Sequence, residues 1–298
     1  MKIAVTGATG FLGRYIVNHL VDAGHECRCW FRQSSDRGGF DGHEQSIEWV
    51  PGALGDEVSC RRLTGGADAV VHAALFRPGP GFRGAEGDLR TFVDVNVTGA
   101  IQLIESARAA GVWRFIFIST CAVHEEILDD RRLDEAHPMW PRSHYGAHKA
   151  AIEEFVYSFG LGDGYDICAL RPTGIYGVAR PIARSKWYTL VQAVKRGDPI
   201  ATDKGGKQVH ASDVAKAVGI LLRADGIRGQ AYNCYDAYVA DQDVAAIARR
   251  ITGSESQINK LNRGPKHQID TSKLRALGMT FGGRELLEAT VCRLVEAT

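Results

Sequence analysis

Net charge, long apolar runs and paired cysteine motifs are all scarce in this sequence of 298 residues. Lys and Arg number 36 and Asp and Glu 35, so the formal net charge is +1. A chain with so small an excess of positive charge has no global attraction to nucleic acid or to an anionic membrane surface. We therefore expect neither of them as a partner.

No apolar run approaches the roughly 20 residues that a helix needs to span a bilayer. The chain begins with the strand-like stretch 2–6, without the basic region and apolar segment of a secretory signal. The sequence therefore predicts a cytoplasmic protein that does not span a membrane.

The seven cysteines, spread from Cys27 to Cys292, form no CxxC pair and no Cys/His cluster with zinc spacing. Their number is odd, and Cys27, Cys29 and Cys168 lie in apolar runs where cysteine behaves as a small buried hydrophobe. We expect reduced thiols and no metal.

Apolar runs rich in β-branched residues alternate with amphipathic stretches through the first half of the chain. The strand-like runs are 3–5, 27–31, 69–72, 115–118 and 166–170, and the helix-like stretches include 12–23, 91–110 and 147–158. Buried parallel strands produce such continuous apolar runs, and helices cover both faces of their sheet. This alternation predicts an α/β fold, a Rossmann-type doubly wound parallel sheet.

The alternation breaks after residue 172, where shorter helical pieces and more Pro, Gly and charge follow. We assign 1–172 to a dinucleotide-binding domain and 173–298 mainly to a smaller C-terminal substrate-binding region. Helix-like 213–222 and strand-like 231–234 predict that the chain returns to the first domain at about 205–235. The two parts are thus interleaved.

A glycine-rich turn follows the first strand-like run and opens a helix, with the sequence Thr6-Gly-Ala-Thr-Gly-Phe-Leu-Gly13. Glycines let the backbone turn tightly and approach a pyrophosphate, whose charge is favoured at a helix N-terminus. The position between a strand and a helix favours a dinucleotide site over a plain turn.

The spacing GxxGxxG, together with Tyr145-Gly-Ala-His-Lys149, resembles the short-chain dehydrogenase/reductase superfamily, especially its extended branch of nucleotide-sugar epimerases and dehydratases. The resemblance implies an NAD(P)-dependent enzyme with a small-molecule substrate. It also implies a homodimer, paired through the stretches 91–110 and 147–158. The implied cofactor contacts are Gly7, Thr9, Gly10, Phe11, Leu12, Gly13, Arg32, Leu54, Ala73, Tyr145, Lys149 and Pro172.

Phe31 occupies the end of the second strand-like run, where an acid would receive the adenosine ribose hydroxyls, and Arg32 follows it. An arginine there can hold a 2′-phosphate by charge-assisted hydrogen bonds. The alternative is a solvated arginine at a strand end. The sequence favours NADP and leaves NAD open.

Tyr145 and Lys149 are four residues apart, which places them on one face of a helix. A free phenol has a pKa near ~10, and a neighbouring cation lowers it. Tyr145 is thus the candidate acid and base. By resemblance, Thr120 hydrogen-bonds the reacting oxygen, with Ser119 as second choice; the alternative for either is a hydroxyl that closes a strand-end turn.

Three further positions carry expectations. Ala53 replaces an acid of the adenine loop, so adenine recognition rests more on Leu54. His124 could reach a substrate, although a loop histidine with internal partners is favoured. Asp213 is expected to cap the helix that follows it.

Cys121 and Ala122 stand where dehydratases of the family carry Asp-Glu, so sugar dehydration is disfavoured. Around Lys207 there is no clear match to the arginine that grips a nucleotide diphosphate. Three hypotheses remain: an epimerase acting on a sugar or nucleotide-sugar, an NADPH-dependent reductase or dehydrogenase of a small non-nucleotide substrate, and a dinucleotide-binding regulator without catalysis.

Overall fold

The computed structural model describes residues 1–79, 84–259, 264 and 266–297, and it divides into two compact units. The first unit is Met1–Pro172, Val214–Cys234 and Ile269–Met279; the second is Thr173–Asp213, Tyr235–Gln268 and Thr280–Thr298. The return to the first unit thus begins at Val214, later than the 205 expected, because the strand β8 (Gly205–His210) pairs within the second unit. The segment Ile269–Met279 is a further return that the sequence did not indicate.

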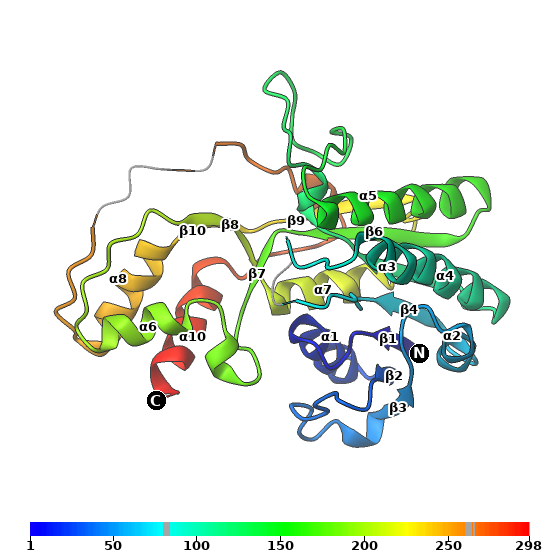
Figure 1. The fold of residues 1–298 in the computed structure, drawn as a ribbon, viewed down its shortest axis with the longest axis horizontal. Helices are drawn as coiled ribbons and strands as arrows, with labels where there is room; N and C mark the ends of the chain where they lie inside the picture. The colour runs from blue at the N-terminus through cyan, green and yellow to red at the C-terminus, as the bar shows by residue number, and fades with distance from the viewer. Residues whose placement is uncertain (80–83, 260–263, 265, 298) are drawn as a thin grey trace. The chain divides into compact units, whose positions relative to one another are not determined.

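A parallel sheet of seven strands forms the centre of the first unit, in the order β3-β2-β1-β4-β5-β6-β9 (Figure 1). Every neighbouring pair runs parallel. The strands are β1 Lys2–Thr6, β2 Glu26–Phe31, β3 Ile47–Pro51, β4 Ala69–His72, β5 Arg114–Ile118, β6 Asp166–Pro172 and β9 Gln230–Cys234. The predicted fold class and its strand-like runs are confirmed.

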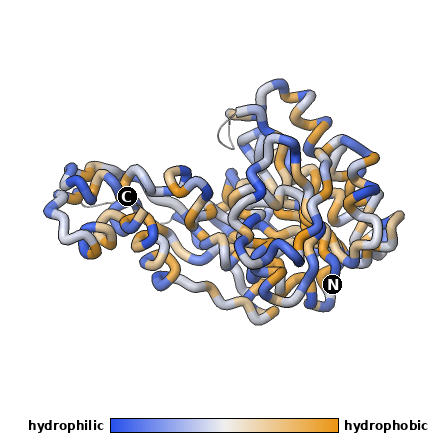
Figure 2. Tube along the Cα trace, turned by 90° about the horizontal axis from the view of Figure 1, so that it is seen from below, coloured by the Kyte–Doolittle hydropathy of each residue, from blue (hydrophilic) through white to orange (hydrophobic). Residues whose placement is uncertain are grey.

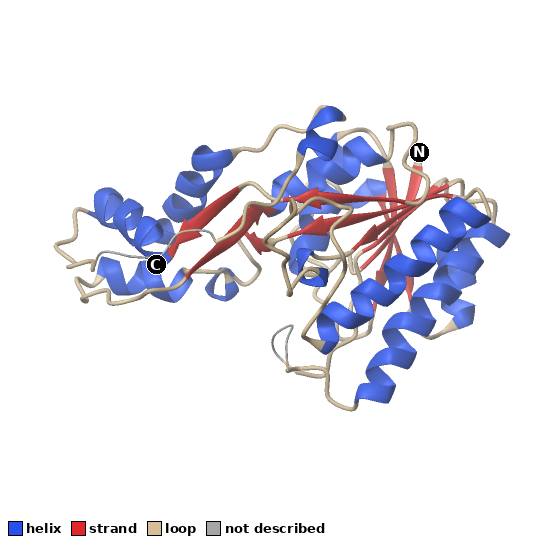
Figure 3. Ribbon diagram, turned by 90° about the horizontal axis from the view of Figure 1, so that it is seen from above, coloured by secondary structure: helices blue, strands red, loops and turns tan. Residues whose placement is uncertain are grey.

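Helices lie on both faces of this sheet (Figure 3). On one face α2 (Glu57–Thr64), α4 (Gly99–Ala109) and α5 (His144–Tyr157) contact one another in that order. On the other, α1 (Phe11–Asp22) meets α7 (Ala211–Leu221) at Gly219, where an added Cβ would lie 2.8 Å from His19 Nε2. The expected helix 91–110 is α3 (Leu89–Val93) and α4, joined by the π-helical turn Asp94–Thr98.

One part of the core of the first unit lies between the sheet and the α2-α4-α5 layer. Alternate strand residues such as Val70, Phe115 and Phe117 meet Leu103 and Ile152 of the helices in one buried cluster. Figure 2 shows hydrophobic segments gathered in the middle of the part of the trace that contains the N-terminus. Because successive residues of a strand face opposite sides, this burial fixes the register of each strand.

The second unit contains a three-stranded sheet in the order β10-β8-β7. β10 (Ala237–Ala240) runs antiparallel to β8, and β7 (Gly174–Tyr176) runs parallel to it. The remaining helices of this unit, α6 (Tyr188–Lys195), α8 (Asp241–Thr252) and α10 (Gly283–Glu296), pack together around Val191, Val244 and Val291. The short helix α9 (Ser272–Ala276) belongs to the first unit, where it contacts β9. In the described ranges, no helix has the length and apolar character needed to cross a bilayer.

Candidate functional site

The glycine-rich turn between β1 and α1 fits closely against the end of β4. Gly7 has φ +72°, and a Cβ there would lie 2.8 Å from the Ala73 carbonyl. A Cβ on Gly13 would lie only 2.0 Å from Gly7 O, so the first turn of α1 rests on the loop. Gly10 precedes α1 and has no side chain to cap the first helical N–H groups. These N–H groups suit a pyrophosphate.

Thr6 fixes the neighbouring strand ends. Its Oγ1 accepts the N–H groups of Ala73 and Ala74, each at 3.1 Å, and lies 2.7 Å from His72 Nδ1. With both acceptor positions used, the hydroxyl donates to His72 Nδ1. Burial lowers the pKa of His72 to about 3, so this ring stays neutral. The turn under the expected nicotinamide is thus held by uncharged groups.

Five of the predicted cofactor residues lie at or just beyond the carboxyl ends of parallel strands, whereas others, such as Phe11 and Tyr145, lie on helices. Gly7 follows β1, Arg32 β2, Leu54 β3 and Ala73 β4, while Pro172 ends β6. The strand order reverses between β1 and β4, and ligands of doubly wound sheets bind at such a switch point. Arg32 is exposed and Leu54 half-buried against the core.

A second arginine, Arg37, lies at the end of β2. The Arg37 guanidinium lies 4.7 Å from the centre of the half-buried Phe31 ring. Arg14 of α1 binds the carbonyls of Gly38 (2.9 Å) and Asp36 (2.8 Å), and also that of Thr9. Arg14 therefore ties the glycine-rich turn to the loop that follows Arg32.

The end of β5 carries two hydroxyls that face different partners. Ser119 donates to the buried carboxylate of Glu153. Thr120 Oγ1 accepts the N–H of Ala122 at 3.1 Å and so closes the turn Cys121–Val123, leaving its own proton to donate. Ser119 is therefore directed into the interior, which supports Thr120 as the first choice.

The first turn of α5 packs on the turn that follows Thr120. A Cβ on Gly146 would lie 2.6 Å from Ala122 O, and Ser143 caps the helix by accepting the Gly146 N–H at 3.1 Å. Tyr145 is half-buried in this turn, and its ring centre lies 5.3 Å from that of His148.

Lys149 follows Tyr145 by one helical turn and is buried. Its Nζ donates to Ile118 O at 2.8 Å and lies 4.5 Å from the centre of the Phe117 ring. Burial lowers the pKa of Lys149 to about 7, and the Glu153 carboxylate opposes that decrease. The structure thus brings Lys149 to the strand end that carries Thr120.

Two comparisons with known sequences bear on identity. Residues 3–234 match the NAD dependent epimerase/dehydratase family. The chain belongs to this family. A low-salt glycan biosynthesis protein, Agl12, of Haloferax volcanii is 26% identical over 294 residues, 93% of each chain. A 3 beta-hydroxysteroid dehydrogenase/Delta 5-->4-isomerase of Mycobacterium tuberculosis is 31% identical over 183 residues, 59% of this chain and 47% of that protein.

Solved structures agree with the fold. The UDP-glucose 4-epimerase of Thermus thermophilus, crystallised with NAD, superposes with a TM-score of 0.79 at 23% identity and covers 100% of both chains. The protein is therefore an enzyme of the extended short-chain dehydrogenase/reductase type, an NAD-dependent epimerase/dehydratase-type oxidoreductase.

The thiol of Cys121 is directed at the backbone of β6. Its Sγ donates to Arg171 O at 2.9 Å, and burial raises the pKa of the thiol to about 12. It can neither accept nor release a proton near neutral pH. The expectation against sugar dehydration stays a prediction.

His124 is a satisfied loop histidine, as the favoured interpretation had it. Its Nδ1 lies 3.1 Å from Pro138 O, its Nε2 lies 3.0 Å from Arg171 Nη1, and burial lowers its pKa to about 4. The expectation that Asp213 caps a helix is wrong. The helix α7 already begins at Ala211, and the Asp213 carboxylate accepts the Gly282 N–H at 3.1 Å.

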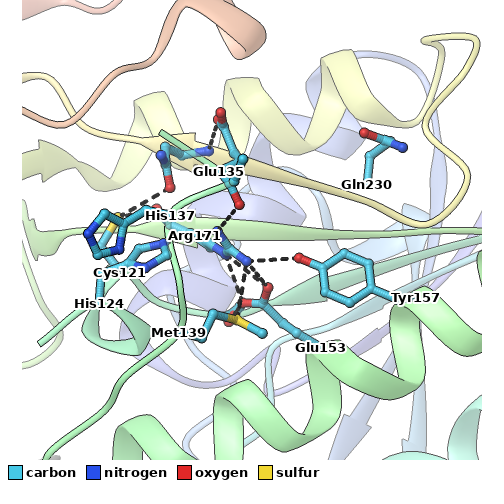
Figure 4. Close-up of polar contacts among 12 residues, drawn as sticks. Cys121, His124, Glu135, His137, Met139, Glu153, Tyr157, Arg171 and Gln230 are labelled. Carbon is cyan, nitrogen blue, oxygen red and sulfur yellow. Dashed lines mark hydrogen bonds and ion pairs between the residues drawn. The ribbon is translucent and has the colours of Figure 1, made fainter. Parts of the chain in front are cut away.

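A buried polar cluster around Arg171 and Glu153 was not predicted from the sequence (Figure 4). Arg171 and Glu153 are both fully buried and form an ion pair at 2.6 Å. A signal was available: Glu153 is four residues beyond Lys149, on the same helix face, and such an acid needs a buried cation as partner.

A cavity of about 490 Å³ lies within the second unit, between its sheet and helices α8 and α10. Tyr176, Gln208 and Tyr238 line it from the strands, and Arg250 and Arg284 from the helices. Both guanidinium groups pair with Glu288, at 2.9 and 2.8 Å. In the described residues, no group of three or more His, Cys, Asp or Glu is placed to hold a metal ion.

Proposed function

We propose that the enzyme oxidises and reduces a secondary alcohol or ketone of a sugar or nucleotide-sugar, with Tyr145 as acid and base. The observation that carries this proposal is the position of Lys149. Its ammonium is buried against the carbonyl of Ile118, two residues before Thr120 and one helical turn after Tyr145. A buried cation at this position contributes little to stability, but it lowers the pKa of a neighbouring phenol.

The proton steps follow from these three side chains. The Lys149 ammonium favours the phenolate of Tyr145, which takes the proton of a substrate hydroxyl, and the phenol returns it in the reverse direction. The Thr120 hydroxyl donates to the reacting oxygen. A phenolate at Tyr145 in turn raises the pKa of Lys149 above its value of about 7, so each group favours the charged form of the other.

The turn between β1 and α1 fits a dinucleotide, because its glycines let the turn pack closely against Ala73 and against α1, and the N-cap residue of α1, Gly10, has no side chain to cap the helix. When bound, the dinucleotide supplies the hydride acceptor and donor. We assign the pyrophosphate to Gly7–Gly13, the adenosine to Arg32 and Leu54, and the nicotinamide side to Ala73, Tyr145, Lys149 and Pro172.

NADP is the proposed cofactor, since Phe31 offers no carboxylate to a ribose hydroxyl and two arginines stand beside it. Arg32 is exposed, and Arg37 stacks on Phe31. A 2′-phosphate would meet two guanidinium groups there. In Arg32→Ala/Arg37→Ala, the Kd for NADPH should rise at least about tenfold, with the Kd for NADH unchanged. An equal change in both would refute the assignment.

Sugar substrates are supported by the relatives, which include a glycan biosynthesis protein over 93% of the chain and a UDP-glucose epimerase of the same fold. A second candidate is an NADPH-dependent reductase or dehydrogenase of a small non-nucleotide substrate. The strand β8 favours it, because it carries Gly205, Gly206 and Lys207 and no arginine for a diphosphate. The similarity to a steroid dehydrogenase points the same way.

Turnover and cofactor state separate these functions. An epimerase converts nucleotide-sugars without net change in nicotinamide absorbance and retains its oxidised dinucleotide on purification. A reductase consumes NADPH stoichiometrically. For both, Tyr145→Phe should lower kcat about 10²–10⁴-fold while dinucleotide affinity is retained. Undiminished function in Tyr145→Phe would revive the hypothesis of a dinucleotide-binding regulator.

A homodimer is the proposed assembly. Leu89 and Val93 on α3, and Phe155 on α5, are large apolar side chains exposed by 43%, 39% and 39%. Val93 and Phe155 lie in the two stretches, 91–110 and 147–158, through which the family pairs, and Leu89 begins the helix that enters the first of them. A second copy would cover these side chains.

A further inference from the structure

The end of β5 is held from α5 by two residues one helical turn apart. Lys149 Nζ donates to Ile118 O at 2.8 Å, and Glu153 accepts the hydroxyl of the next residue, Ser119. Thr120 comes directly after this pair. The position of the Thr120 hydroxyl relative to α5 is therefore set by Glu153 as well as by Lys149.

Glu153 is itself clamped from the neighbouring strand. Arg171 of β6 donates from Nε to both carboxylate oxygens, at 3.1 and 2.9 Å, and from Nη2 at 2.6 Å. The remaining Arg171 donors bind His124 Nε2 (3.0 Å), Glu135 O (3.2 Å) and Tyr157 Oη (2.9 Å) (Figure 4). With both side chains fully buried, the carboxylate has one orientation.

Few charged groups surround this carboxylate. Three histidines near it stay neutral, because burial lowers the pKa of each: His72 on β4, His148 on α5 and His124 in the loop between β5 and α5. Glu135 in that loop faces Arg171, and burial raises its pKa. Tyr157 on α5 is a phenol whose pKa burial also raises.

The end of β5 is thus bound by Lys149 and by Glu153, and Glu153 forms a buried ion pair with Arg171. Replacing such a buried ion pair by apolar residues is often neutral or stabilising, so stability alone does not account for it. The position of Glu153 on α5, one helical turn after Lys149, accounts for the ion pair instead.

We propose that Glu153 is a positioning residue of the proton-transfer site, which keeps Lys149 charged and holds the end of β5 through Ser119. This inference rests on the proposed role of Tyr145. Without the Glu153 anion, Lys149 loses its proton more readily, and the phenolate of Tyr145 loses the cation that favours it.

The test follows the phenolate of Tyr145 directly and needs no substrate. Ultraviolet difference absorbance of the full chain is recorded against pH, with Tyr145→Phe as the reference that isolates the Tyr145 signal. In the pair-replacing variant Glu153→Leu/Arg171→Met, the Tyr145 titration should move up by about one pH unit or more. Glu154→Gln, which changes the exposed neighbour of Glu153 on α5, should leave it in place.

An unchanged Tyr145 titration in the folded double variant overturns the inference, provided that Lys149→Met raises it. If Lys149→Met also leaves the Tyr145 titration unchanged, Lys149 does not act on Tyr145, and the proposed function is contradicted independently of Glu153. Should the double variant not fold, NMR titration of ¹³C-labelled lysine in Glu153→Gln gives the answer. The pKa of Lys149 should fall, and an unaltered value overturns the inference.

Discussion

At the scale of single residues, the buried ammonium of Lys149 is the group whose environment most affects both stability and chemistry. Burial depresses its pKa from 10.5 to about 7, and the Ile118 carbonyl and the Phe117 ring compensate only part of the lost hydration. The folded state thus bears a cost that the proposed proton transfer requires. Such costs are typical of functional sites.

This cost has a definite pH dependence. Between pH 7 and 10.5 the unfolded state binds the Lys149 proton and the folded state does not, so stability rises with pH across this window. Below pH 7 both states are protonated and the full cost is present. Lys149→Met should therefore raise the free energy of unfolding by about 1–3 kcal/mol at pH 6 and by much less near pH 10.

Urea denaturation at the two pH values measures this difference. Lys195→Met, at an exposed position in α6, serves as the control and should change stability little at either pH. An equal gain from Lys149→Met at pH 6 and pH 10 would contradict a depressed pKa in the folded state.

At the scale of elements, the turn between β1 and α1 depends on close backbone approach more than on any side chain. Gly7 meets the end of β4, and Gly13 meets Gly7. The sequence predicted this turn from its glycine spacing and its position between a strand and a helix, and only glycine permits both contacts. It did not predict Arg14, whose side chain joins the turn to the loop after β2.

Gly13→Ala places a methyl group where Gly7 O lies 2.0 Å away, so the turn must move. We expect the dinucleotide Kd to rise at least about tenfold and the free energy of unfolding to fall by about 1–3 kcal/mol. Isothermal titration and urea denaturation test the two effects. Gly162→Ala is the control, since a Cβ there meets nothing within 4 Å. A Gly13→Ala protein that binds the dinucleotide as tightly as this control does would contradict the assignment of the pyrophosphate to Gly7–Gly13.

At the scale of the whole molecule, the strand order brings together residues that are far apart in the chain. Gly7, Ala73 and Thr120 follow the neighbouring strands β1, β4 and β5, so one edge of the sheet collects them. The same fold exposes apolar side chains on α3 and α5, the proposed dimer surface.

Val93→Glu/Phe155→Glu should convert the proposed dimer to a monomer, because charges at a buried apolar interface lose hydration without a partner. Sedimentation velocity over a range of concentrations measures the change in mass. Trp140→Glu alters an apolar side chain exposed by 50% outside these helices and should leave the mass unchanged. A wild-type protein that sediments as a monomer would refute the assembly.

Local patterns determined a large part of this protein. The periodicity of apolar residues predicted the strands of the parallel sheet, and the glycine spacing with Tyr145 and Lys149 indicated the family, since these signals act within a few residues of the chain. The strands β7, β8 and β10 of the second unit were not predicted from these patterns. Its strands, such as β7 with three residues, are short, and β8 begins with two glycines.

Only the tertiary structure decided which polar groups face one another. The partnership of Glu153 with Arg171 and Ser119, the inward direction of Cys121 and the burial of Lys149 depend on pairing between β5, β6 and α5. Those contacts join residues 18 to 50 positions apart, and a side chain's charge state depends on the neighbours that folding brings to it. The sequence by itself determined the chemistry available, and the fold determined the pKa at which each group works.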